Sequence, residues 1–157
     1  DHPQCRLSLI TATEQVFGMI LAEEVSICPP APGEGGTCNV VSLPLDAPDK
    51  GLTLTLSLST GTDASRAITA RMIGAETDNV PPGDTNNGLI EIANVIGGRL
   101  QNTLTEQGLA TEVGTPTARE ESATAAPEER PDHMVLTFAF EKGDPTFTVS
   151  LEVKAAA

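Results

Sequence analysis

Two polar residues, Glu91 and Asn94, stand three positions apart in a stretch with helical spacing. Residues three apart are neighbours on the surface of a helix. A carboxamide both donates and accepts hydrogen bonds, so an exposed Asn94 can hold a water molecule in line with a phosphoryl group. A carboxylate such as Glu91 can anchor a lysine of the molecule that carries this group. The chemistry open to this pair is therefore hydrolysis by an oriented water.

Other kinds of catalytic chemistry find no support in the sequence. Glu91 and Asn94 cannot act as a nucleophile and its base, because no histidine is placed to help them. The chain also lacks a phosphate-binding loop, a nucleotide-binding glycine fingerprint and a Ser-His-Asp pattern with a nucleophile elbow. His133 beside Asp132 is interpreted as a surface histidine at the start of a strand. From the residues alone, a solvated surface pair is the commoner interpretation of Glu91 and Asn94.

The pair is predicted to lie on a helix over Asp84–Leu104. Polar residues that can cap a helix open this stretch at positions 84 to 86. At about 100° per residue, the apolar residues fall on one stripe that predicts a buried face. This stripe consists of Leu89, Ile92, Ala93, Ile96 and Leu100. Gly98 lies one turn beyond Asn94 on the opposite face, although glycine costs about 1 kcal/mol relative to alanine in a helix. A missing side chain beside the polar pair indicates a surface that another molecule approaches closely.

The string EIANVIGG over residues 91–98 resembles the signature helix of the CheC/CheX/FliY group of chemotaxis phosphatases. The upstream string DASRAITARMIGAETDNV and the opening TATEQVFGMIL also resemble this group, so the likeness covers most of residues 7–153. CheC-type proteins carry a second E-x-x-N in their first helix. Here Phe17 stands three residues after Glu14, which favours the one-site CheX type. Arg99 follows the glycines where the group more often has a small or polar residue.

The resemblance implies a phosphatase that hydrolyses the phospho-aspartate of a CheY-like response regulator in chemotaxis or two-component signalling. In this role, Asn94 would orient the attacking water and Glu91 would pair with the active-site lysine of the regulator. Gly97 and Gly98 would permit docking. The resemblance implies no cofactor of the chain's own, because Mg²⁺ belongs to the regulator, and it implies a homodimer. The alternative is a non-catalytic docking module of the same fold in a signalling or flagellar-switch assembly.

The remaining elements predict an α+β fold, with a mostly antiparallel sheet and two or three helices packed on it. Further helices are predicted at Leu7–Leu21 and at Asp63–Ile73, the second ending at Gly74. The clearest strand signal is the strict alternation over Gly51–Thr60. The other predicted strands are Glu23–Cys28, Cys38–Leu43, Leu109–Val113, His133–Glu141 and Pro145–Val153, and the last two form a hairpin.

The segment over residues 115–132 is acidic, rich in alanine and proline and nearly free of large apolar residues. It predicts an exposed loop. The 157 residues of the chain are interpreted as a single domain with its core over about residues 7–153.

Composition excludes several classes of partner. Nine basic and 22 acidic residues give a net charge of −13, which argues against a nucleic acid or an anionic membrane. We expect a cytoplasmic protein, since no apolar run approaches the roughly 20 residues of a membrane span and no signal peptide is recognised. An odd cysteine count without CxxC favours reduced thiols, with a Cys28–Cys38 pair across a hairpin as the minor alternative. No metal site is expected, because neither histidine has ligand spacing.

Overall fold

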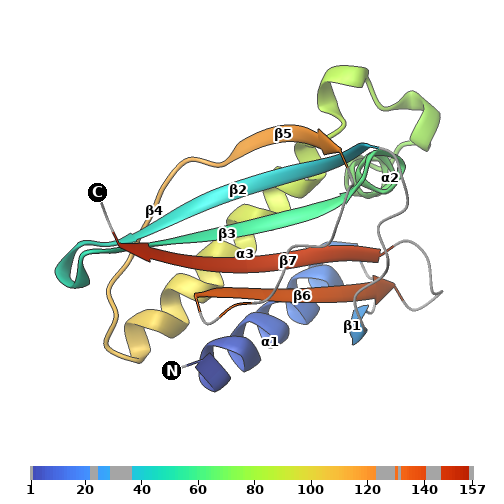
Figure 1. The fold of residues 1–157 in the computed structure, drawn as a ribbon. Coiled ribbons are helices and arrows are strands. Elements are labelled where there is room, and N and C mark those ends of the chain that lie inside the picture. The colour runs from blue at the N-terminus through green and yellow to red at the C-terminus, as the bar shows by residue number, and fades with distance from the viewer. Residues whose placement is uncertain are drawn as a thin grey trace.

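The computed structural model describes residues 2–21, 25–28, 37–122, 130, 132–140 and 146–155. Within these ranges, three α-helices pack with a seven-stranded sheet in which every pair of strands is antiparallel (Figure 1). The helices are α1 (His2–Leu21), α2 (Thr62–Ile73) and α3 (Asn87–Glu106). The strands are β1 (Val25–Cys28), β2 (Thr37–Ala47), β3 (Leu52–Gly61), β4 (Glu112–Val113), β5 (Thr117–Ser122), β6 (His133–Phe140) and β7 (Thr146–Ala155). The predicted fold class is confirmed.

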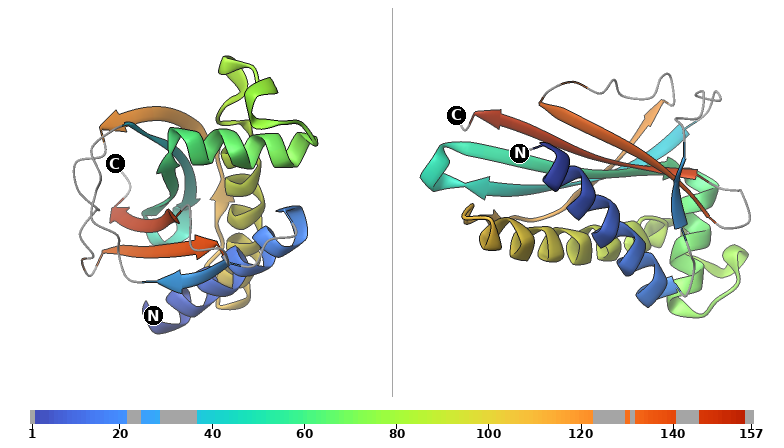
Figure 2. Two further views of the ribbon diagram at one scale, coloured as in Figure 1. Left: turned by 90° about the vertical axis from the view of Figure 1, so that its right-hand side faces the viewer. Right: turned by 90° about the horizontal axis from the view of Figure 1, so that it is seen from below.

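The sheet has the strand order β1-β6-β7-β3-β2-β4, and β5 also pairs with β2. Its central strand, β3, is the one with the strict alternation of leucine and small polar residues. Leu54, Leu56 and Leu58 are buried, while Thr55 and Ser57 of the opposite face are partly exposed. Figure 2 shows α1 and α3 on one side of the sheet. The leucines of β3 therefore face the helices, and the small polar residues line the other side.

The core lies between α1, α3 and the apolar face of the sheet. All five residues of the predicted α3 stripe are buried, with at most 1% of their surface exposed. The ring of Phe147 on β7 stacks on Phe17 of α1 at a centroid distance of 4.4 Å and on Phe138 of β6 at 5.3 Å. These contacts fix α1 to the sheet beside α3. Within the described part of the chain, no helix is both long enough and apolar enough to cross a membrane.

The acidic segment after α3 differs from its prediction. A loop was predicted over residues 115–132, but residues 117–122 form strand β5 and pair with residues 37–42 of β2. The loop prediction is wrong for this part. Positions 117–121 are exposed, so backbone pairing with the edge of β2 holds the strand in place rather than burial of apolar side chains. The rest of the predicted loop includes residues 123–129, which lie outside the described residues.

The sheet order also decides the relation of two cysteines. Cys28 lies on β1 and Cys38 on β2, and the strands β6, β7 and β3 stand between β1 and β2. The two residues therefore do not face each other across a hairpin, and that alternative is wrong. Cys38 is a free thiol.

Candidate functional site

The polar pair lies on the solvent side of α3. Glu91 and Asn94 are both exposed, and the buried stripe of the same helix faces the opposite direction, against the sheet. A Cβ atom added at Gly98 would meet no atom within 4 Å. The three residues lie along one line of the helix surface, with Asn94 between the carboxylate and the glycine. A molecule that approaches this line meets a carboxylate, a carboxamide and bare backbone in turn.

The start of α3 is fixed by a residue of another helix. Asn86 stands in the N-cap position, yet its side chain makes no capping hydrogen bond. Instead, Thr69 of α2 accepts a hydrogen bond at Oγ1 from the backbone N–H of Gly88, at 3.0 Å. The same hydroxyl donates to the carbonyl oxygen of Thr85 at 2.9 Å. For Asn86, the prediction of a side-chain cap is therefore wrong, because Thr69 of α2 supplies the partner of the Gly88 amide.

A polar network extends from this cap into the sheet. Ser65 of α2 donates to the carbonyl oxygen of Thr85 at 2.9 Å and lies 3.0 Å from Oδ1 of Asn86. Asn39 of β2 donates to Oδ1 of Asn86 at 2.6 Å and accepts from Thr62 at 2.7 Å. Asn39 is only 1% exposed, so its amide depends on these partners. The network ties the first turn of α3, and with it Glu91, to α2 and β2.

We predict that Thr69→Val destabilises the protein by about 2 kcal/mol. Valine has nearly the same shape but leaves the N–H of Gly88 and the carbonyl of Thr85 without this partner, and an unpaired buried polar group costs about 1–3 kcal/mol. Urea unfolding followed by circular dichroism measures the change. The control is Thr105→Val, since Thr105 is exposed and donates only to the carbonyl of Gln101 within α3. We expect a change within about 0.5 kcal/mol for this control. Equal effects of the two substitutions would contradict the role of Thr69.

Gly97 and Gly98 occupy different sides of α3. Gly97 is buried, and a Cβ atom there would overlap the side chain of Leu43 on β2 and lie 3.9 Å from Leu56. Gly97 therefore lets α3 lie close to the sheet, and it has no place on the exposed line. Of the two glycines predicted to permit docking, only Gly98 lies beside Glu91 and Asn94. The burial of Gly97 could have been inferred from the sequence, because Gly97 follows Ala93 by four residues and so lies on the same buried face of the helix.

One charged residue beside the pair comes from the same helix but is oriented by α1. Arg99 is partly exposed, and its guanidinium donates to Oε1 of Gln15 at 2.9 Å and to Sδ of Met19 at 2.8 Å. Both partners are uncharged. Sequence reasoning did not place these residues together, because Gln15 and Arg99 are 84 positions apart and no local pattern connects them.

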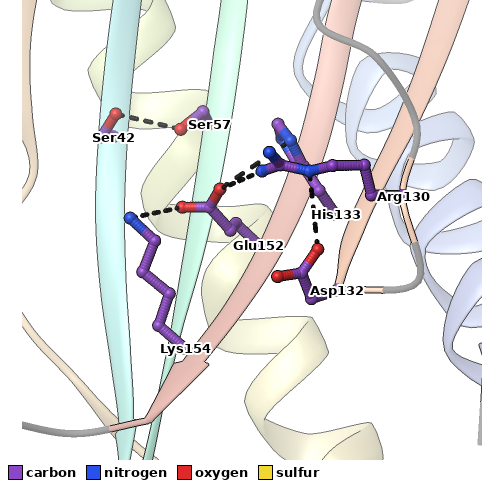
Figure 3. Close-up of polar contacts among 7 residues, drawn as sticks. All are labelled: Ser42, Ser57, Arg130, Asp132, His133, Glu152 and Lys154. Atoms are coloured by element: carbon purple, nitrogen blue, oxygen red, sulfur yellow. Dashed lines mark hydrogen bonds and ion pairs between the residues drawn. The ribbon is translucent and has the colours of Figure 1, made fainter.

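A second polar cluster lies on the face of the sheet that carries no helix (Figure 3). Glu152 accepts from Arg130 at 3.1 Å and from Lys154 at 3.1 Å, and Nδ1 of His133 lies 3.9 Å from the same carboxylate. Arg130 also lies 3.6 Å from Asp132. His133 thus borders an ion-pair cluster around Glu152, on the side of the sheet away from Asn94. Among the described residues, no group of three or more His, Cys, Asp or Glu could hold a metal ion.

No protein-family model matches the chain, and no curated protein matches its sequence. Solved structures do match. The chemotaxis protein CheX from Desulfovibrio desulfuricans superposes with a TM-score of 0.73 at 18% identity, over 96% of this chain and 99% of that one. FliY from Thermotoga maritima superposes with a TM-score of 0.63 at 17% identity, over 92% of this chain and 83% of that one.

A third similar structure contains a partner protein. It is a CheX–CheY–BeF3–Mg²⁺ complex from Borrelia burgdorferi, with a TM-score of 0.68, 13% identity and coverage of 94% of this chain and 96% of that chain. These likenesses extend over nearly the whole described fold and agree with the resemblance carried by residues 91–98. The chain has the fold of the CheX- and CheC-like chemotaxis proteins.

Proposed function

We propose that this chain is a phosphatase that hydrolyses the phospho-aspartate of a CheY-like response regulator. The observation that carries the proposal is the exposure of Glu91 and Asn94 on one face of α3, beside the unobstructed Gly98. The CheX-like fold supports it, and one protein of this fold forms a complex with CheY. A non-catalytic docking module of the same fold would use the same surface, so the experiment must separate binding from turnover.

In the proposed reaction, Asn94 enters the active site of the regulator. Its side-chain oxygen accepts a hydrogen bond from the attacking water, and its N–H donates to an oxygen of the phosphoryl group or of the water. The water attacks phosphorus, the bond to the aspartate oxygen breaks, and inorganic phosphate leaves. A neutral carboxamide suits this position, because a carboxylate would repel the anionic phosphoryl group.

The second residue of the pair controls the approach. Glu91 pairs with the active-site lysine of the regulator and fixes the depth and direction at which Asn94 enters. Mg²⁺ is held by the regulator in this scheme and neutralises charge on the phosphoryl group. The chain therefore contributes to catalysis by positioning one water molecule and the phosphorylated regulator that this water attacks.

The experiment follows phosphate release from a phosphorylated, magnesium-loaded response regulator encoded beside this chain, with and without the chain. Acceleration supports the phosphatase. Binding without acceleration supports the docking module instead. If neither this regulator nor a second one is bound or dephosphorylated, the proposal fails.

We predict that Glu91→Gln lowers kcat/KM about tenfold to a hundredfold, because the amide keeps the shape of the carboxylate and loses its charge. Initial rates of phosphate release at several regulator concentrations measure the change. A matched control is Glu106→Gln, which removes an exposed carboxylate at the end of the same helix and should leave the rate unchanged. Equal rates for Glu91→Gln and the unaltered chain would remove Glu91 from the mechanism.

A further inference from the structure

The guanidinium of Arg99 is held in place by uncharged partners within the described part of the chain. Its hydrogen bonds go to the uncharged side chains of Gln15 and Met19, and among the described residues no carboxylate lies within ion-pair distance of it. Arg119 and Arg130 differ in this respect, since Arg119 pairs with Glu121 and Arg130 with Glu152, whereas Arg66 also has no ion pair among the described residues. In a chain with a net charge of −13, a cation left unpaired beside the candidate site indicates a use outside the molecule.

Arg99 is also accessible from solvent. It lines an open groove between α1 and α3 whose other walls include Leu7, Thr11 and Gln15 of α1 and Asn102 and Thr103 of α3. Leu7 and Met19, on either side of Gln15 along α1, expose 64% and 68% of their surface. An acidic side chain of a docked protein can therefore reach the guanidinium, with apolar surface of α1 beside it. The hydrogen bonds to Gln15 and Met19 of α1 orient the planar guanidinium before a partner binds, which reduces the conformational entropy lost on binding.

Charges of opposite sign thus mark two places on one helix. Glu91 and Arg99 are eight residues apart, which is about 12 Å along the helix axis. Asn94 and Gly98 lie between them along the axis, whereas around the axis Arg99 is turned by about 80° from Glu91, toward α1. A partner with a cation and an anion at the matching separation would bind in one orientation, and the reversed orientation would bring like charges together.

We propose that Arg99 is a specificity-determining residue that pairs with a carboxylate on the surface of the response regulator. The inference rests on the proposed function for the identity of the partner. Glu91 and Arg99 together set the orientation in which Asn94 reaches the phosphoryl group. Arg99 itself touches neither the water nor phosphorus, so its contribution lies in binding.

The test measures the Kd for the regulator loaded with Mg²⁺ and beryllofluoride, together with kcat and KM for phosphate release. Arg99→Gln should weaken binding about tenfold and Arg99→Glu still more, while kcat at saturation changes by less than about twofold. Added salt should weaken binding of the unaltered chain more than that of Arg99→Gln. The matched control is Lys50→Gln, which removes one exposed positive charge from the turn between β2 and β3 and should leave Kd unchanged.

A rescue experiment separates recognition from helix packing. Carboxylates around the phosphorylation site of the regulator are changed to lysine one at a time, and one of these changes should restore binding to Arg99→Glu. A purely structural role for Arg99 between α1 and α3 would give neither this rescue nor the change in salt dependence.

Each outcome bears on one proposal or both. An unchanged Kd in both Arg99 variants overturns this inference, and the phosphatase proposal stands if phosphate release persists. Binding that depends on Arg99 without any acceleration upholds this inference and overturns the phosphatase. Absence of binding by the unaltered chain overturns both.

Discussion

Asn94→Ala should reduce the acceleration of phosphate release by a factor on the order of 10² or more, because removing one preorganised hydrogen-bonding group from a transition state typically costs 10²–10³ in kcat. The side chain is exposed and no hydrogen bond of it to another described residue is seen, so the melting temperature should hardly move. Phosphate release at saturating regulator gives kcat, and Kd for the beryllofluoride-loaded regulator should rise much less than kcat falls.

Two further variants sharpen this prediction. Asn94→Asp keeps the shape but loses the donor and places a negative charge beside the phosphoryl group, so it should be inactive too. Asn79→Ala removes another exposed carboxamide, in the turn before α3, and should leave the rate unchanged. Full turnover by Asn94→Ala would refute the water-orienting role, whatever the affinity of this variant for the regulator.

Two adjacent glycines of α3 should respond to substitution in opposite directions. Gly97→Val should destabilise the protein by about 3 kcal/mol, because the added methyl groups enter the space of Leu43, which is fully buried in the core. Gly98→Ala should stabilise it by about 0.5–1 kcal/mol, since open space surrounds that position and alanine is the better helix former. For a chain of this size these changes correspond to a melting temperature lowered by about 6–12 °C and raised by about 1–4 °C.

Thermal unfolding followed by circular dichroism measures both shifts, and each glycine variant serves as the control for the other. The comparison tests the helical phase of α3 directly. If Gly98→Ala destabilised the protein more than Gly97→Val, the face that carries Glu91 and Asn94 would be the packed one, and the proposed docking surface would be lost with it.

The elements that carry the site could be predicted because their signals are local. The apolar stripe of α3 repeats every three or four residues, and burial against the sheet follows from that period. The same period places Glu91 and Asn94 on the solvent side. In β3, leucines alternate with threonine and serine, so the burial of one face can be predicted without knowledge of the neighbouring strands.

Features that depend on distant neighbours could not be predicted in this way. Thr69 caps a helix that begins 18 residues later, and Arg99 contacts Gln15, which lies 84 positions earlier in the chain. Strand β5 contains Thr117–Ser122, almost wholly polar, and forms because the edge of β2 offers backbone partners. No periodicity reveals such a strand, and the acidic composition predicts a loop instead.

The cap supplied by Thr69 has a consequence for the order of folding. In the first turn of α3 the Gly88 amide donates to Thr69 of α2 and not to a sequence neighbour, so this turn gains its full stability only after α2 has docked. A chain in which α2 is detached would retain the middle of α3 against the sheet while its leading turn frays. Glu91 lies one turn from that end, so the exposed face with Glu91 and Asn94 would reach its final structure only once α2 and α3 are packed together. Amide exchange at Gly88 would then report the detachment of α2 rather than the fraying of α3 alone.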